Sequence, residues 1–247
     1  MRTRSLAVAG LALLALAGCS ASPAPSSSTA ELEGTLTVAA AASLQNAFTE
    51  LGDLFEDANP ELSVEFAFAG SSALVTQLQE GAPGDVFASA DVANMEKAAE
   101  LLSGGSELFA SNTLTIVTPP GNPAGVETFA DLADAQLVVC AAQVPCGAAS
   151  AAEAEAAGVT LSPVSEEQSV TDVLGRVTSG EADAGLVYVT DAEAAGDTVD
   201  RIDFDTTVVN EYPIAALNDS EVAAAFIAFV LSDEGQAVLA SYGFLAP

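Results

Sequence analysis

The sequence contains no histidine and very few basic residues. Histidine is the commonest general base and metal ligand in proteins, so its absence removes the usual means of acid–base and metal chemistry. Only 5 lysines and arginines accompany 35 aspartates and glutamates, which gives a formal net charge of −30. A chain with this charge does not bind nucleic acid or an anionic membrane surface electrostatically. We therefore expect neither a nucleic-acid partner nor a histidine-dependent enzyme.

Cysteines are also few, three in all, and the first of them marks a leader segment. Arg2 and Arg4 precede a short apolar run that ends at Cys19. The run is too short to span a bilayer comfortably, so residues 1–18 are predicted to be a signal peptide. The sequence before Cys19 resembles a bacterial lipobox, which implies that Cys19 becomes the lipidated first residue. An ordinary signal peptide that happens to contain a cysteine is the alternative.

Residues 19–33 are rich in serine, proline and alanine and contain little that a core could bury. This composition is typical of a flexible tether. We expect an extracytoplasmic protein that contacts the membrane only through its lipid anchor.

The two remaining cysteines, Cys140 and Cys146, are six residues apart. Disulfides persist in an extracytoplasmic compartment, so the pair could be bridged, and two free buried thiols is the alternative. We predict the bridge.

The rest of the chain alternates short apolar strands with helical patterns, which is typical of an α/β protein. Residues 34–112 and 211–247 are expected to form a first lobe, and 113–210 a second. The chain would cross between them near residues 111–114 and 210–213. One last helix, from Ser220 to Tyr242, would close the first lobe. Two such lobes predict a ligand cleft with a hinge.

Small residues surround two turns in which a strand ends and a helix begins. Four alanines precede Ser43, and Ala69-Gly70 precede Ser71. The start of a helix presents unpaired N–H groups and the positive end of the helix dipole, so it suits an anion. Val170 lies in the first turn of a third predicted helix, and Cys146 opens a fourth. Helix capping by the two serines is the simpler interpretation.

Five segments occur in the same order in a known family. They are VAAAASLQNAFTEL, FAGSSALVTQLQEGAPGDVFASAD, VPCG, EADAGLVYVTDA and EGQAVLASYGF. They are similar to the molybdate-binding proteins that feed ABC importers, from about Gly34 to Phe244. The resemblance implies a type II periplasmic-binding-protein fold, with a ligand cleft between two lobes and two hinge crossings.

The resemblance also implies which residues bind the oxyanion. Ser43 and Ser71 would donate through hydroxyl and backbone N–H, Cys146 and Val170 through backbone N–H, and Tyr188 through its hydroxyl. Molybdenum would be held as molybdate, with no direct protein ligand to the metal and no further cofactor. Tungstate is expected to bind as well. The implied partner is the permease of an ABC importer, and a monomer is expected.

A site made only of donors favours fully deprotonated anions over hydrogen phosphate, because a buried ligand O–H without an acceptor costs roughly 1–3 kcal/mol. Sulfate would be rejected by its smaller size. The main alternative keeps the fold but binds another oxyanion or a small solute such as sulfate. An enzyme using Asp85 and Asp91 is disfavoured, because both carboxylates are simpler to explain as structural caps. Arg176 is expected to be exposed and paired with acidic neighbours.

Overall fold

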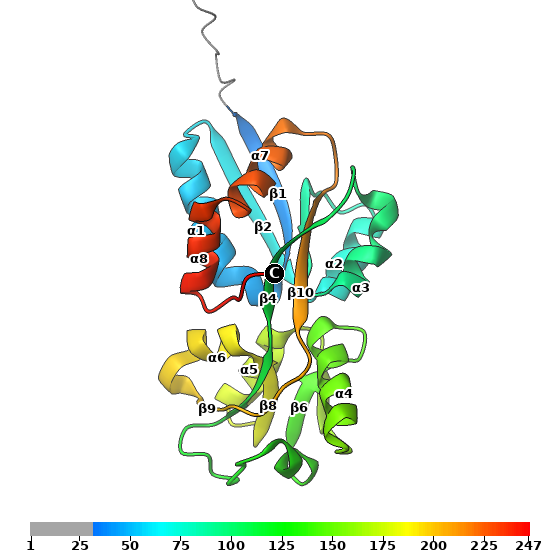
Figure 1. The fold of residues 1–247 in the computed structure, drawn as a ribbon, viewed down its shortest axis with the longest axis vertical. Coiled ribbons are helices and arrows are strands. Elements are labelled where there is room, and N and C mark those ends of the chain that lie inside the picture. The colour runs from blue at the N-terminus through cyan, green and yellow to red at the C-terminus, as the bar shows by residue number, and fades with distance from the viewer. Residues whose placement is uncertain (1–31) are drawn as a thin grey trace, which may run out of the picture. The chain divides into compact units, whose positions relative to one another are not determined.

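The structure, a computed structural model, describes residues 32–247. The predicted signal peptide, Cys19 and most of the predicted tether lie outside the described residues. The described chain contains two five-stranded sheets, ordered β2-β1-β3-β10-β4 and β7-β6-β8-β5-β9. Each sheet is the centre of one lobe, with helices packed against it (Figure 1). The α/β class predicted from the sequence is confirmed.

The strands are short and their bounds follow the apolar runs of the sequence. They are β1 (Gly34–Ala41), β2 (Leu62–Ala69), β3 (Val86–Ala88), β4 (Glu107–Asn112), β5 (Leu114–Thr118), β6 (Leu137–Cys140), β7 (Ser165–Glu167), β8 (Ala184–Tyr188), β9 (Asp200–Ile202) and β10 (Asn210–Ala216). The α-helices are α1 (Gln45–Ala58), α2 (Ser71–Gln79), α3 (Val92–Lys97), α4 (Pro145–Ala157), α5 (Val170–Thr178), α6 (Val189–Ala195), α7 (Glu221–Val230) and α8 (Asp233–Ser241). Short 3-10 helices are η1 (Ala42–Leu44), η2 (Ala99–Leu101), η3 (Phe129–Ala133) and η4 (Gly196–Thr198).

In the first lobe, β1 lies between β2 and β3 and is parallel to both. From Val38 to Ala41 its side chains are buried on both faces, which explains the apolar run at the end of the strand. Helix α1 repeats its apolar residues at helical spacing and packs this face into the core. Phe48 of α1 makes edge or tilted contacts with Phe66, Phe109 and Phe226, so one helix joins distant parts of the lobe.

In the second lobe, β6 is parallel to β7 and β8, and β5 is antiparallel to β8 and β9. Helix α5 packs Val173 and Val177 against Gly185 of β8, where an added Cβ would lie 2.9 Å from each valine. The absence of a side chain at Gly185 therefore allows helix and sheet to approach closely.

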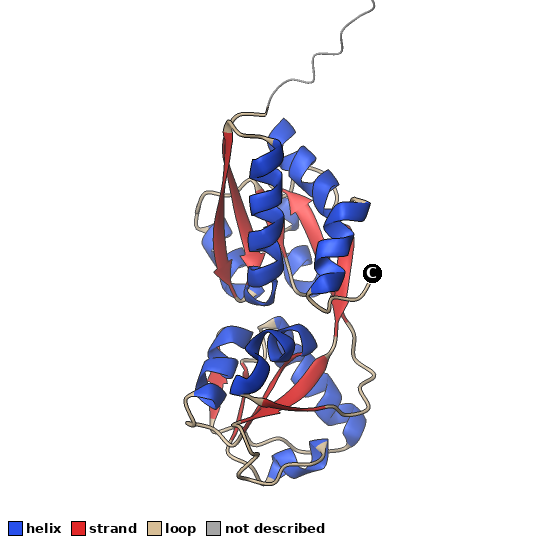
Figure 2. Cartoon of the chain, turned by 90° about the vertical axis from the view of Figure 1, so that its left-hand side faces the viewer, coloured by secondary structure: helices blue, strands red, loops and turns tan. Residues whose placement is uncertain are grey.

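The two lobes are connected by two extended segments, which lie side by side where β4 pairs with β10 (Figures 1 and 2). The chain leaves the first sheet at the end of β4, and only Thr113 separates β4 from β5. It returns through residues 203–209 into β10, whose Asn210 pairs with Asn112 of β4. Apart from these two adjacent connections, the lobes restrain each other only through their contact across the cleft.

The predicted single helix from Ser220 to Tyr242 is wrong, because the structure divides it into α7 and α8 with a bend of 59°. Ser232 caps α8 by accepting from the Gly235 N–H, and an added Cβ at Gly235 would lie 2.3 Å from the Phe229 carbonyl oxygen. A new cap and this close approach end the first helix.

Within residues 32–247 no single helix has both the length and the apolar composition of a membrane span. The bent pair α7–α8 meets those criteria only when its two helices are counted together.

Candidate functional site

The carboxyl ends of several strands meet between the two lobes. Ala41 of β1 pairs with Ala69 of β2, so these two parallel strands end at the same edge of the first sheet. The turns after them carry Ser43 and Ser71. Together with residues that follow β6 and β7 and with the last residue of β8 in the second sheet, they line a small cavity. This is the position in which open α/β sheets bind ligands.

All five residues that the resemblance implies line this cavity, and they come from both lobes. They are Ser43, Ser71, Cys146, Val170 and Tyr188. The remaining lining residues are small or apolar: Ala41, Ala42, Gly70, Ala90, Val144 and Pro145. The alanine-rich end of β1 therefore lies against the cavity, where larger side chains would fill the space.

Gly70 shows how closely the lobes approach. A Cβ built on Gly70 would lie 2.1 Å from the carbonyl oxygen of Gln168 in the second lobe and 3.3 Å from Cγ1 of Val144. Carbon and oxygen atoms of separate groups do not approach to 2.1 Å, so only glycine allows this lobe contact. The structure is therefore a closed form of the cleft.

Ser43 is placed by η1, the short helix between β1 and α1. Its side chain makes no helix-capping hydrogen bond, so the simpler capping interpretation is wrong for this residue. Its Oγ instead lies 3.0 Å from the hydroxyl of Tyr212, a buried residue of β10. The hydroxyl of Ser43 is thus held at the cavity by a residue far away in the sequence.

Ser71 is the first residue of α2, and Gly70 occupies the cap position before it. The Ser71 side chain does not cap the helix, so the capping interpretation is wrong here too. Its Oγ accepts a hydrogen bond from the backbone N–H of Ala90, at 3.0 Å. An N–H in the first turn has no intrahelical partner, so the backbone of Ser71 also provides a donor.

The second lobe contributes two further helix starts. Cys146 follows Pro145 in the first turn of α4, and Val170 is the first residue of α5. Their N–H groups have no intrahelical partners, and both residues line the cavity. Ser169 caps α5 by accepting from the Asp172 N–H. Cys140 and Cys146 form a disulfide, which ties the end of β6 to the first turn of α4.

Tyr188 is the last residue of β8. It is buried from the outer solvent, and it is one of the residues that line the cavity. Its hydroxyl accepts a hydrogen bond from Nδ2 of Asn210, at 3.0 Å. Burial raises the pKa of the Tyr188 hydroxyl well above its ordinary value, so the group keeps its hydrogen and can donate it. Tyr188 adds a neutral donor to the cavity.

No lysine or arginine among the described residues lines this cavity. Arg176 pairs with Glu167 and Glu181 on the surface of the second lobe, as predicted. Lys97 lines a different opening between the lobes. The cavity can therefore attract an anion only through local dipoles, namely hydroxyl groups and the N–H groups of helix starts.

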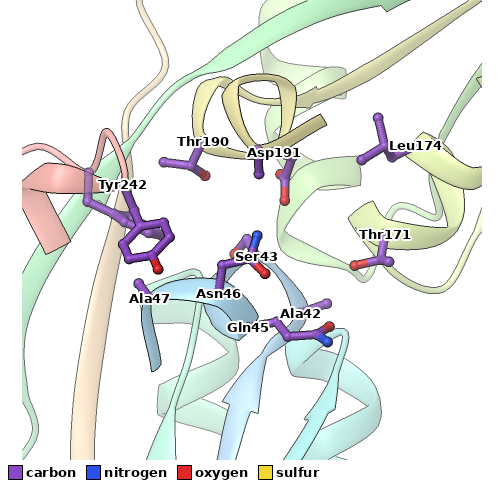
Figure 3. Close-up of a pocket in the computed structure, with 12 residues that line it drawn as sticks. Ala42, Ser43, Gln45, Asn46, Ala47, Thr171, Leu174, Thr190, Asp191 and Tyr242 are labelled. Atoms are coloured by element: carbon purple, nitrogen blue, oxygen red, sulfur yellow. The ribbon is translucent and has the colours of Figure 1, made fainter. Parts of the chain in front are cut away.

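A second cavity, of about 160 Å³, shares Ala42 and Ser43 with the first (Figure 3). Thr190 and Asp191 of the second lobe face Ser43 and Asn46 of the first lobe across it. Burial raises the pKa of the Asp191 carboxyl to about 7, although the Tyr188 N–H that donates to it acts in the opposite direction. A carboxyl that titrates near neutral pH therefore lies beside the donor cavity.

The acidic residues considered for an enzyme have structural roles in the described part of the chain. Oδ2 of Asp85 accepts from the Thr37 N–H at 2.7 Å, and Asp91 caps α3 through the Asn94 N–H at 2.8 Å. Residues 32–247 contain no group of three or more histidine, cysteine, aspartate or glutamate side chains placed to hold a metal ion.

Sequence reasoning missed the residues behind the cavity wall: Tyr212, Asn210 and the backbone of Ala90. Tyr212 and Asn210 lie on an extended segment whose apolar pattern resembles any other strand. Their contacts with Ser43 and Tyr188 depend on how strands from both lobes come together, so no local signal marks them.

A ligand cavity lined by both lobes, at the carboxyl ends of parallel strands, is typical of proteins that bind a small solute. The chain matches the family described as bacterial extracellular solute-binding protein over residues 36–245, and it belongs to this family. This is a family of binding proteins of transport systems and not of enzymes.

Three similar proteins support this assignment. The molybdate-binding protein ModA of Mycobacterium tuberculosis is 48% identical over 222 residues, covering 86% of this chain and 85% of ModA. The putative ABC transporter substrate-binding lipoprotein YvgL of Bacillus subtilis is 30% identical over 248 residues, covering 95% of each chain. The periplasmic molybdate-binding protein of Azotobacter vinelandii has a similar structure, with a TM-score of 0.72 at 19% identity, over 86% of this chain and 99% of that one. The predicted two-lobed type II fold is confirmed.

Proposed function

We propose that this protein captures molybdate, and tungstate as well, and delivers it to the permease of an ABC importer. The observation that carries the proposal is the meeting of five candidate donor residues, from both lobes, in one cavity whose lining contains no charged side chain. The 48% identity to a protein named for molybdate binding supports the choice of ligand. In this proposal no cofactor is needed, and the oxyanion is held through its oxygens by Ser43, Ser71, Cys146, Val170 and Tyr188.

Closure follows from the division of donors between the lobes. A ligand shifts an equilibrium toward the state that it binds more tightly, and only the closed state brings both donor sets to one anion. The lobes, 34–112 with 211–247 and 113–210, would move about the crossings at residues 111–114 and 210–213. The closed form would then be presented to the permease. We further propose that the protein acts as a monomer, tethered outside the cytoplasm through a lipid on Cys19.

Calorimetric titration with molybdate, tungstate, sulfate and phosphate tests this function. Tight binding of the first two with weak or absent binding of the others is expected. Tight binding of sulfate instead would establish the alternative ligand, and heat from none of the four anions would refute an oxyanion-binding role.

Single serine substitutions test the site itself. Ser43→Ala and Ser71→Ala should each weaken molybdate binding by roughly 1–3 kcal/mol, because each removes a hydrogen-bond donor to a charged oxygen. Ser179→Ala is a matched control, since its exposed hydroxyl donates to the Arg176 carbonyl at the C-terminal end of α5, whereas Val170 at the cavity begins the helix. Unchanged affinity in both cavity variants would show that the ligand binds elsewhere.

A further inference from the structure

Lys97 is the only lysine of the chain. The other basic side chains within residues 32–247 are Arg176 and Arg201, and each of them pairs with two carboxylates. In this part of the chain Lys97 makes no ion pair, and its Nζ donates instead to Oδ1 of Asn94, at 3.1 Å. Among 35 acidic residues, this exposed lysine therefore has a positive charge that no carboxylate neutralises by contact.

Asn94 fixes the position of the lysine. Its side chain is buried, and its Nδ2 donates to both carboxylate oxygens of Asp91, at 2.8 and 3.0 Å. A carboxylate accepts and an ammonium group donates, so the amide can have only this orientation, with Oδ1 toward Lys97. Nδ2 also lies 3.5 Å from the carbonyl oxygen of Gln143 in the second lobe. A neutral amide thus holds the ammonium group at the boundary between the lobes.

Lys97 lines an opening between the lobes, of about 430 Å³, in which every other lining residue is uncharged. The polar ones are Ser72, Thr76, Gln79, Asn94, Gln143 and Gln168. The opening borders the donor cavity on both lobes, because Ser72 follows Ser71 of the cavity and Gln143 precedes Val144 of the cavity. The contact between Gly70 and Gln168 lies at this border. Separation of the lobes there would join the opening to the cavity.

Two other openings lined by both lobes carry carboxyl groups. The cavity shown in Figure 3 contains Asp191, and the opening beside α4 and β10 contains Asp91 and Glu211. An ionised carboxyl group repels a dianion, whereas an ammonium group attracts it. Of these three openings, the one at Lys97 is therefore the electrostatically favourable path for an anion.

We propose that the opening at Lys97 is the entrance to the binding site, and that Lys97 is the first contact of the incoming oxyanion. This inference rests on the proposed function. With a formal net charge of −30, the chain as a whole repels a dianion, and one unpaired cation at the entrance opposes that repulsion where capture occurs. The entrance accepts any small dianion, because it recognises charge alone. Selection among anions is left to the neutral donors of the cavity behind it.

An entrance residue changes rates more than affinity. The anion passes Lys97 when it enters and again when it leaves, so loss of the charge slows both steps by a similar factor. The dissociation constant, which is the ratio of the two rate constants, then changes little. About 5–10 Å apart in water, a dianion and one ammonium group attract each other enough to raise the local anion concentration by roughly three- to twentyfold at low ionic strength.

The test measures the association and dissociation rate constants of molybdate by stopped-flow fluorescence at an ionic strength of about 10 mM. The chain has no tryptophan, and Tyr188 lines the cavity, so tyrosine fluorescence supplies the signal. Lys97→Gln removes the charge at the entrance. Arg201→Gln is the matched control, because it also removes one positive charge but lines none of the three openings. Lys97→Arg keeps the charge.

We expect the association rate constant to fall by roughly three- to twentyfold in Lys97→Gln and further in Lys97→Glu, in which the charge is reversed. The dissociation rate constant should fall by a similar factor, so that the dissociation constant stays close to the wild-type value. Lys97→Arg should bind at the wild-type rate, and Arg201→Gln should change either rate constant only slightly.

An association rate constant no lower in Lys97→Gln than in Arg201→Gln would overturn the inference. A change confined to the dissociation rate constant would also overturn it, because Lys97 would then act on the bound state. Slow association in Lys97→Arg would show that the contact with Asn94 matters and the charge does not. None of these results would affect the proposed function, which fails only if the wild-type protein binds no molybdate.

Discussion

Replacing Gly70 by alanine should prevent full closure of the cleft without disturbing either lobe. Gly70 has φ −60° and ψ 139°, a conformation that alanine adopts without strain. The added methyl would lie 2.1 Å from the Gln168 carbonyl oxygen, whereas ordinary contact begins at 3.4 Å. The lobes must therefore separate here by 3.4 − 2.1 = 1.3 Å. A backbone oxygen cannot rotate aside as a flexible side chain can.

The expected loss of molybdate affinity follows from the displacement of the residues next to Gln168. Gln168 lies two residues before Val170, which is the first residue of α5, lines the cavity and is the proposed backbone N–H donor there. An N–H···O distance that grows by more than 1 Å from its usual 2.9 Å is no longer a hydrogen bond. A hydrogen bond to a charged group contributes roughly 1.5–3 kcal/mol. Loss of this one donor corresponds to about 10- to 150-fold weaker binding.

Calorimetric titration with molybdate measures this loss, and small-angle X-ray scattering with and without molybdate measures closure. Gly175→Ala is the matched control, because it makes the same substitution within α5 at a position with no other atom within 4 Å of the added methyl. We expect the control to bind and contract like the wild type. If Gly70→Ala binds molybdate as tightly as the control does, the closed contact seen here is not part of the bound state.

Three further predictions concern charge and the disulfide. The Asp191 carboxyl, with its pKa raised to about 7 by burial, binds more protons in the native state than unfolded, so both stability and anion affinity should fall as pH rises through about 7. Asp191→Asn should flatten this profile in titrations at about pH 6 and about pH 8, and an unchanged slope would exclude Asp191 as its source. Replacing Cys140 and Cys146 by serine should lower the free energy of unfolding by roughly 2 kcal/mol in denaturant titrations, with little change in affinity, since the proposed site uses only the backbone N–H of Cys146. Lys97→Gln should slow molybdate association in stopped-flow measurements at low salt and not at high salt, and a salt-independent effect would contradict electrostatic steering.

Much of the first lobe's contribution could be predicted from residues close together in the sequence. A strand of small residues followed by a serine and an amphipathic helix specifies a helix start at the carboxyl edge of a parallel sheet. That is where Ser43 and Ser71 lie. The positions in the second lobe are less distinctive by themselves, because Val170 and Cys146 are proposed to act through backbone N–H groups that any residue has. The resemblance was needed to select them.

The supporting contacts could not be predicted, since they join residues far apart in the sequence. Ser43 and Tyr212 are 169 residues apart, and Asn210 and Ala90 are 120 apart. An alternating pattern shows that a segment is a strand with one buried face, but it does not show which side chain of another strand will face it. The break between α7 and α8 was missed for a different reason. Both helices continue the apolar pattern, and only the local cap at Ser232 separates them.

The excess of acidic residues in the chain and the absence of basic residues from the cavity are both consistent with recognition of an anion by neutral donors. A lysine or arginine at the site would bind any anion by charge and would discriminate poorly between a protonated and a deprotonated one. Neutral donors are weaker at long range, but they are directional, and inside a closed cavity their hydrogen bonds are strong because water is excluded. The Asp191 carboxyl fits the same argument, because its burial without a basic partner keeps its charge small near neutral pH. In the proposed site, therefore, recognition depends on directional neutral donors and not on a basic side chain.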